Sequence, residues 1–206
     1  MPGRIYNMAN FKKQFLLYTP GITEKLTFRD EEFEKLGFKL KAEVNSIFGR
    51  SLSIRELDSG SDNAAEIEMN NLSTPHYDVE RFGITFVASP RHADVLAITG
   101  AVTHNMEIAV RKTYAAMPSP KFVIAIGDDA CNGGIFAGTY AVNGGADKVV
   151  PVDLKIPGNP PSPLEIIRAL HGFMTVLSHR KTKHQQYLRT IKNIESPLWL
   201  LPLPPN

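Results

Sequence analysis

Cysteine is nearly absent from this sequence, which contains one, Cys131, in 206 residues. A single thiol excludes a disulfide within the chain, and it excludes an iron–sulfur cluster held by cysteines of this chain alone. Long apolar runs are absent too, since no window approaches the roughly 18 uninterrupted apolar residues of a membrane-spanning helix. Residues 1–18 are polar and basic without a secretory apolar stretch, so we do not expect export.

Charge of either sign is not in large excess. The formal net charge is only +2, which gives no support to nucleic-acid binding. One stretch, residues 166–194, nevertheless has no acidic residue. It is either a solvated basic helix end or a surface that faces anionic lipid or an acidic partner subunit. Its arginines and lysines are Arg168, Arg180, Lys181, Lys183, Arg189 and Lys192.

Short apolar runs alternate with helical patterns between residues 51 and 178. Leu52–Leu57 alternates as a strand does, and three further runs are typical of parallel strands buried on both faces. This alternation predicts an α/β domain with a parallel, doubly wound sheet flanked by helices. The three runs are Ile84–Ala88, Val95–Thr99 and Phe122–Ile126, with a fifth strand at Lys148–Leu154 and helices at Ala64–Leu72, Asn105–Met117 and Leu164–Leu177. For the last helix, Ser162 and Glu165 predict a capping box.

The chain therefore divides into an arm (1–50), the α/β domain (51–178) and a tail (179–206). In the arm, residues 30–49 predict an amphipathic helix with an apolar stripe that includes Phe33, Leu36 and Leu40. This helix either packs on its own domain or, as we favour, docks on another subunit or a membrane surface. The tail is basic and then apolar and proline-rich around Trp199, Leu200 and Leu201, which predicts an extended segment lying in a groove of another subunit.

Three loops with marked residue patterns follow predicted strands. Gly60–Glu68 follows the first strand, Gly127–Gly134 the fourth and Pro157–Pro161 the fifth. Loops beyond the carboxyl ends of parallel strands meet at one edge of the sheet, where ligands of such folds bind. The sequence therefore predicts a site built from these loops.

These loops and several segments between them, in order along residues 51–174, resemble one family. The family is that of the small electron-transfer subunit of energy-converting nickel–iron hydrogenases and the related 20 kDa-type subunit of respiratory complex I. The spacing Asp62-x-x-Ala65 mirrors the Cys-x-x-Cys pair of the hydrogenase branch, whereas complex I has adjacent cysteines there. The matching segments are Thr74–Ile84, Ser89–Leu96, Thr99–Thr103, Lys121–Asp128, Gly133–Phe136 and Val150–Asp153.

The resemblance implies a flavodoxin-like fold and one 4Fe-4S cluster, the last electron relay before the nickel–iron or quinone site of a large partner subunit. Where the family has its four thiolates, this sequence has Asp62, Ala65, Asp129 and Asn159. Two carboxylates, a methyl group and a neutral amide do not replace four thiolates. We therefore expect no 4Fe-4S cluster and no other cofactor in this chain.

The remaining polar residues of these loops leave several interpretations open. Cys131 is either a thiol shifted into the site or, as we expect, a small buried side chain. Asp62, Asp129 and neighbouring loop residues, Glu66 among them, are solvated or hydrogen-bonded carboxylates, a proton-handling cluster or ligands of a hard divalent cation. Glu68 is the best single candidate for proton handling, because it matches a glutamate that the family ties to proton transfer.

These features predict a subunit that is not catalytic by itself, in a membrane-associated complex related to energy-converting hydrogenase and complex I. It would lie at the cytoplasmic face of the membrane and bridge a large hydrogenase-like subunit to the membrane arm. Proton or conformational coupling would be its remaining role. The alternatives are a working redox subunit with an unusual cluster or a quinone site, and a stand-alone protein with a new ligand.

Overall fold

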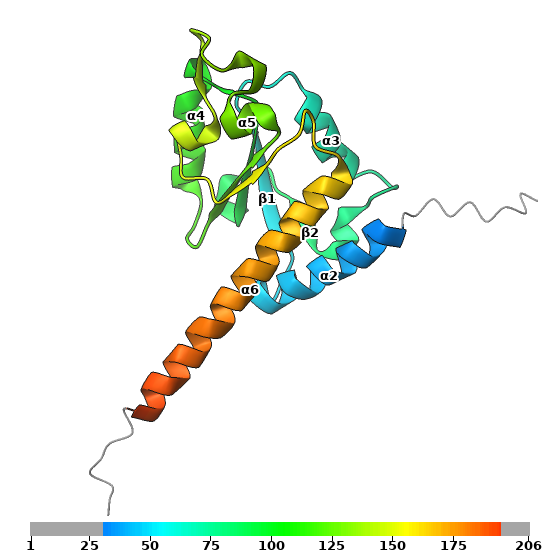
Figure 1. Ribbon diagram of the computed structural model, residues 1–206, viewed down its shortest axis with the longest axis vertical. Helices are drawn as coiled ribbons and strands as arrows, with labels where there is room; N and C mark the ends of the chain where they lie inside the picture. The colour runs from blue at the N-terminus through cyan, green and yellow to red at the C-terminus, as the bar shows by residue number, and fades with distance from the viewer. Residues whose placement is uncertain (1–30, 195–206) are drawn as a thin grey trace, which may run out of the picture.

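The computed structural model of the protein describes residues 31–194, of which 183–185 and 187–194 are described by their backbone alone (Figure 1). The parts of the predicted arm and tail at 1–30 and 195–206, Trp199, Leu200 and Leu201 included, lie outside the described residues. In chain order the elements, with η for a short 3-10 helix, are α2 (Glu31–Phe48), β1 (Leu52–Asp58), α3 (Ala64–Leu72), η1 (Val79–Phe82), β2 (Ile84–Phe86), η2 (Pro90–His92), β3 (Val95–Thr99), β4 (Val102–Thr103), α4 (His104–Ala116), β5 (Phe122–Ile126), α5 (Asp128–Asn132), η3 (Gly134–Phe136), β6 (Val142–Gly144), η4 (Ala146–Lys148), β7 (Leu154–Ile156) and α6 (Pro163–Ile194).

A five-stranded parallel sheet lies at the centre, with the strand order β2-β1-β3-β5-β7. When its strands are counted along the chain, this is the 2-1-3-4-5 order of flavodoxin-like folds, so the predicted fold class is confirmed. β3 is the middle strand and every one of its residues is buried, as its continuous apolar run predicts. β4 and β6 form a separate antiparallel ribbon.

Helices cover both faces of the sheet. α2, α3 and α6 lie on one side, and α4 and α5 lie on the other (Figure 1). On the first side Met69 of α3 and Met174 of α6 belong to one core with Ile124 of β5. On the second side Val110 of α4 is buried with Cys131 of α5. This three-layer arrangement leaves the loops after the strands together at one edge.

The helix predicted at 30–49 packs on its own domain, so its predicted docking on another subunit or on lipid is wrong. Phe33, Leu40 and Val44 of α2 are buried in the first core, and Leu36 packs against it. The partners of this stripe come from η1 and α6, which follow far along the chain. Local sequence patterns carry no information about such distant partners.

α6 begins as predicted but continues much further. The backbone N–H of Ser162 donates to Glu165 Oε2 at 2.8 Å, which closes the predicted capping box. The helix then runs to Ile194 instead of ending at Leu177, so the extended conformation predicted for residues 179–194 is wrong. No proline follows Pro163 before residue 197, so nothing in the sequence breaks the helix earlier. The end of α6 projects away from the sheet (Figure 1).

The fifth predicted strand lies later in the chain than expected. β7 spans Leu154–Ile156, whereas Val149 and Val150 are buried in the core beneath α4 and α5. Pro151 has no backbone N–H and cannot donate to a strand ladder. The apolar run before it therefore forms a buried turn, which a short apolar pattern does not distinguish from a strand.

Candidate functional site

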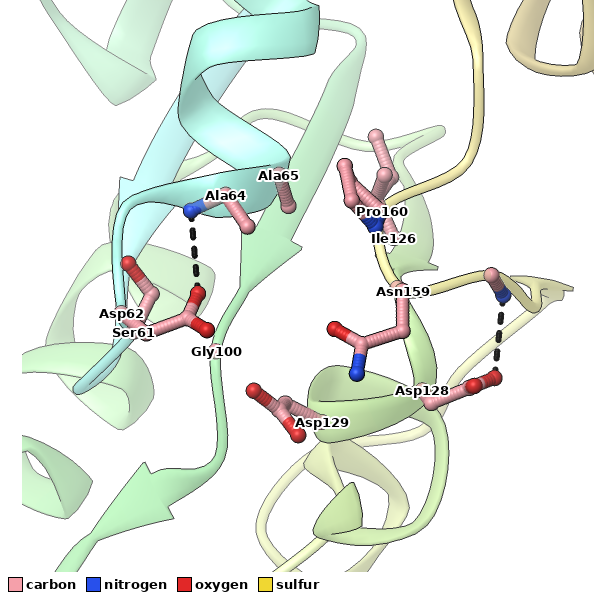
Figure 2. Close-up of a pocket in the computed structure, with 12 residues that line it drawn as sticks. Ser61, Asp62, Ala64, Ala65, Gly100, Ile126, Asp128, Asp129, Asn159 and Pro160 are labelled. Carbon is pink, nitrogen blue, oxygen red and sulfur yellow. Dashed lines mark hydrogen bonds between the residues drawn. The ribbon is translucent and has the colours of Figure 1, made fainter. Parts of the chain in front are cut away.

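A small hollow lies where the carboxyl ends of the strands meet the loops that follow them (Figure 2). The predicted meeting of the marked loops is therefore confirmed, and all four positions where the family has thiolates line this hollow. The complete set of lining residues is Ser61, Asp62, Ala64 and Ala65 before and in α3, Gly100 after β3, Ile126, Gly127, Asp128 and Asp129 around the start of α5, and Gly158, Asn159 and Pro160 after β7.

Local hydrogen bonds shape the loop between β1 and α3. Asp58 Oδ1 accepts hydrogen bonds from the backbone N–H groups of Gly60 and Ser61 at 2.8 and 2.9 Å. Asp62 Oδ1 accepts from the backbone N–H of Ala64 at 2.9 Å (Figure 2). Asp62 is therefore held at the start of α3, with its side chain on the exposed rim of the hollow.

Gly100 is required by a close approach of two backbones. It has a φ of +72°, which favours glycine, and a Cβ there would overlap the backbone of Ser61. The loop after β3 can therefore lie directly against the loop after β1. This contact forms one wall of the hollow.

The start of α5 is joined to the loop after β7 by two hydrogen bonds. The backbone N–H of Asp128 donates to the carbonyl of Gly158 at 2.8 Å. Asp128 Oδ1 in turn accepts from the backbone N–H of Gly158 at 2.9 Å (Figure 2). Sequence reasoning did not single out Asp128, because its role depends on a partner about thirty residues later that only the fold brings near.

Asp129 is the buried acid of the hollow, with 9% of its surface exposed. Burial raises the pKa of its carboxyl, and the negative charges of Asp62, Asp128 and Glu66 raise it further. A hydrogen bond from the backbone N–H of Ile135 acts in the opposite direction. These causes favour the protonated form, as in sites where carboxylates lie close together.

Two glutamates of α3, Glu66 and Glu68, have contrasting environments. Glu66 is 8% exposed, and neither of its carboxylate oxygens has a hydrogen-bond partner among the described residues. Its charge contributes to the raised pKa of Glu56 on β1, after the larger effect of burial. Glu68 is partly exposed and accepts from Asn71 Nδ2 at 3.3 Å. Neither glutamate lines the hollow. Of the two glutamates, Glu66 is therefore the buried one, whereas the predicted proton-handling role of Glu68 stays a prediction.

Cys131 of α5 is buried in the core on the α4 side of the sheet and does not line the hollow. Its Sγ lies 3.6 Å from the carbonyl oxygen of Ala125, and burial raises the pKa of its thiol to about 11. A thiol that stays protonated is a poor metal ligand and nucleophile. This placement agrees with the expected small buried side chain.

The residues that line the hollow include three aspartates and no lysine, arginine or histidine. Within residues 31–194, no group of three or more histidine, cysteine, aspartate and glutamate side chains is arranged to hold a metal ion. Figure 2 shows the side chains of Asp62, Asp129 and Asn159 directed into the same space. The site therefore concentrates negative charge without an internal cation.

The strand order and the hollow define a flavodoxin-like domain with a loop-lined hollow at the carboxyl edge of its sheet. A family model described as the 20 Kd subunit of NADH ubiquinone oxidoreductase matches residues 63–173. This chain belongs to that family, as its motifs indicate.

Two relatives and one solved structure show which branch of the family is similar. Formate hydrogenlyase subunit 7 of Escherichia coli (strain K12) is 44% identical over 138 residues, 67% of this chain and 53% of that protein. The probable membrane-bound hydrogenase subunit mbhJ of Pyrococcus furiosus is 42% identical over 136 residues, 66% of this chain and 80% of that protein. A chain of the membrane-bound sulfane sulfur reductase (MBS), an archaeal respiratory membrane complex, has a TM-score of 0.58 at 30% identity and covers 79% of this chain and 93% of that one. This chain thus matches only about half the length of the formate hydrogenlyase subunit.

The donor atoms of the hollow do not fit the 4Fe-4S cluster that the resemblance implies. Such a cluster is held by thiolates, and the hollow offers carboxylate oxygens from Asp62 and Asp129, an amide from Asn159 and no donor atom from the side chain of Ala65. Hard oxygen ligands suit magnesium and calcium better than iron–sulfur clusters.

Proposed function

We propose that this chain is a non-catalytic subunit of a membrane-associated complex related to energy-converting hydrogenases and complex I, and that it holds no 4Fe-4S cluster. It would connect a large hydrogenase-like subunit to the membrane arm. The observation that carries the proposal is the loop-built hollow, which has Asp62, Ala65, Asp129 and Asn159 where the family has its thiolates. Electron transfer through this chain would then be lost while its position in the complex is kept.

Exposed apolar side chains of α3, η3 and the loop after η3 support the presence of a partner subunit. Ile67 of α3 is 51% exposed, Ile135 of η3 is 78% exposed, and Tyr140 in the loop after η3 is 97% exposed. Large apolar and aromatic side chains that are exposed in an isolated subunit are often found in protein–protein interfaces. The relatives are named as subunits of formate hydrogenlyase and of a membrane-bound hydrogenase, which is consistent with such a partner.

A peripheral place at the cytoplasmic face of the membrane is the second part of the proposal. No helix within residues 31–194 has the length and apolar character to cross a membrane. The basic composition of residues 166–194 and the projecting end of α6 support a contact of this helix with membrane-arm subunits or anionic lipid (Figure 1).

Metal analysis tests the loss of the cluster. We expect the complex, purified without oxygen, to contain no iron or acid-labile sulfide attributable to this subunit. A chain with Asp62→Cys, Ala65→Cys, Asp129→Cys and Asn159→Cys is the matched control, because it returns four thiolates to the same hollow. Iron gained by the control and absent from the unmodified chain supports the proposal. About four irons per unmodified chain would overturn it and favour the redox alternative.

Truncation tests the bridging role. A chain that ends after Thr182 keeps the core and the contact of Lys181 Nζ with the carbonyl of Ser46 at 2.8 Å, but it lacks the projecting end of α6. We expect it to fold and to be lost from the complex. Normal co-purification of the shortened chain with the large and membrane subunits would contradict the bridging role of α6.

Proton handling by Asp62, Glu68 and Asp129 stays a prediction. The raised pKa of Asp129 supports a part for this residue, whereas the partnered, partly exposed Glu68 has no comparable environment. Proton translocation by the complex carrying Asp129→Asn or Glu68→Gln, compared with its substrate turnover, would separate coupling from assembly.

A further inference from the structure

An apolar groove lies between α6 and the edge of the sheet, away from the hollow. Its volume is about 420 Å³, and its lining is mostly apolar and comes from α6 and from the starts of β5 and β7. β7 is an edge strand, and no further strand within residues 31–194 pairs with its outer side. Val176 of α6 lines the groove and is 51% exposed. Concave apolar surfaces of this kind are where ligands and peptide segments bind.

Two aromatic rings and a glycine shape this groove. Phe122 of β5 and Phe173 of α6 meet edge to face with their ring centroids 5.5 Å apart, and both are only partly buried. Gly172 lines the groove inside α6, and a Cβ at this position would have no atom within 4 Å. Because glycine lowers the stability of a helix relative to alanine, packing within residues 31–194 does not explain its presence here. It does allow another backbone to come close to α6.

The aromatic lining indicates what kind of segment fits. Grooves lined by aromatic side chains bind proline-rich segments, which are already extended and therefore lose little conformational entropy on binding. The end of this chain, residues 196–206, has such a composition and is called the C-terminal segment below. It contains four prolines, four leucines and Trp199, and it has no charged side chain. An uncharged, apolar and proline-rich segment matches a groove with a mostly apolar lining.

The chain after α6 is long enough to reach the groove. α6 ends at Ile194, and the 14 residues of helix between this end and Arg180, the nearest residue of the groove lining, span about 21 Å. The 12 residues 195–206 span about 37 Å at the rise of a polyproline II helix. Pro197 cannot continue the helix, so the chain can change direction there. A chain that turns back at this point would pass Arg180 and bring Leu203 to the level of Val176.

We propose that the C-terminal segment folds back along α6 and lies in this groove, in place of docking on another subunit. Its attachment to α6 gives it a high effective concentration at the groove, so a weak contact is sufficient. The segment would cover Phe173 and Val176 and protect the edge strand β7 from pairing with other chains. This inference goes beyond the proposed function and does not depend on it, because it concerns a contact within one chain.

Disulfide trapping in the isolated full-length chain tests the contact. Val176→Cys with Leu203→Cys introduces two thiols that the inference brings together, and the native Cys131 does not compete because it is buried and its pKa is raised to about 11. The control pair is Thr182→Cys with Leu203→Cys. Thr182 is exposed, does not line the groove and lies nearer the end of α6, so an undocked segment meets it at least as often. We expect the disulfide within one chain to form about tenfold faster in the first pair than in the control. Equal rates would leave the groove to residues 1–30 or to another protein and would overturn the inference.

Fluorescence of Trp199, the only tryptophan of the chain, provides a second measurement. Gly172→Met fills the groove, and Thr182→Met places the same side chain on α6 outside it. We expect Trp199 to be shielded from a soluble quencher in the unmodified chain and in Thr182→Met, and to become accessible in Gly172→Met. Equal accessibility in all three chains would mean that the segment lies elsewhere and would overturn the inference. Shielding that requires the large and membrane subunits would assign the segment to another subunit, and shielding that depends on protein concentration would assign it to a second copy of the chain. Either result would also overturn the inference, while the proposed loss of the cluster and the bridging role of α6 would stand.

Discussion

The α2–α6 layer and the hollow at the carboxyl edge of the sheet differ in how completely the chain pairs its own groups. In the layer, the apolar stripe of α2 is buried, and Lys181 Nζ of α6 donates to the carbonyls of Ser46 and Ile47 at 2.8 and 2.9 Å. The residues that line the hollow include three aspartates and no lysine, arginine or histidine, and Glu66 of the adjoining α3 is buried without a partner among the described residues. The difference indicates that α2 is part of the domain's own scaffold, whereas the acids at the edge are less completely paired within the described residues.

Breaking the self-contained layer should have the largest effect on folding. Leu40 of α2 is fully buried, so Leu40→Ala should lower the free energy of unfolding by about 2–5 kcal/mol. Lys39→Ala, next to it on the exposed face, should change it by less than about 0.5 kcal/mol. Chemical denaturation measures both. A loss below about 1 kcal/mol for Leu40→Ala would show that α2 does not depend on this core. That result would again favour the docking of α2 on another subunit.

Disturbing the close approach of two backbones at Gly100 should have the next largest effect on the free energy of unfolding. Gly100→Ala should cost about 2–4 kcal/mol, because it adds steric overlap with Ser61 to the strain of a positive φ. Gly49 has a φ of +68° but no atom within 4 Å of the place that a Cβ would take, so Gly49→Ala should cost only about 1 kcal/mol. Equal costs in chemical denaturation would show that the loops after β1 and β3 are not in contact.

The pH dependence of stability should reveal the excess acid at the edge. The pKa of Asp129 is raised on folding, so the folded state holds its proton to higher pH than the unfolded state does. Stability from this group is therefore present below its unfolded pKa and lost as pH rises through the folded pKa. Asp129→Asn should raise the melting temperature by on the order of 1–3 °C at pH 7 and by nothing at pH near 3. A stabilisation that persists at acid pH would point to packing instead of charge.

Substitution of Asp147 should change stability in the opposite direction to substitution of Asp129, and by the smallest amount. Its pKa is lowered chiefly by the hydrogen bond from Lys155 Nζ at 2.7 Å. Its contribution is present above the unfolded pKa and is lost as pH falls through the folded pKa, so Asp147→Asn should lower the melting temperature at pH 7 and have no effect in strong acid. Because the pair is well exposed, the cost should stay below about 1 kcal/mol. The same sign for Asp147→Asn and Asp129→Asn would contradict the contrast between paired and unpaired acids.

Local patterns predicted the central strands well, because a strand that is buried on both faces is a nearly continuous run of apolar residues. Val95–Thr99 and Phe122–Ile126 are strands with the predicted bounds. Patterns failed where distant partners decide the structure. The stripe of α2 finds its cover in α6, and the turn at Val149 and Val150 is buried beneath α4 and α5.

The two glutamates of α3 show what the sequence alone could not predict about the surroundings of the site. Glu66 and Glu68 are two residues apart, and since a helix turns by about 100° per residue, they lie on nearly opposite faces. Family likeness favoured Glu68, but the packing of α3 buries Glu66 instead. The sequence alone could not assign the buried position, because the amphipathic pattern of this short helix is weak and both residues are acids.

Composition and order by themselves determined the class of the fold, the meeting of the marked loops and the lack of thiolates around them. These follow from local rules, because the alternation of strand and helix patterns, the positions of the loops and the identity of each side chain can be read directly from the sequence. Only the tertiary structure decided that α2 belongs to the domain, that Cys131 lies in the core and that Glu66 is buried without a partner among the described residues. Burial and pairing depend on contacts between segments far apart in sequence, and these exist only once the chain is folded.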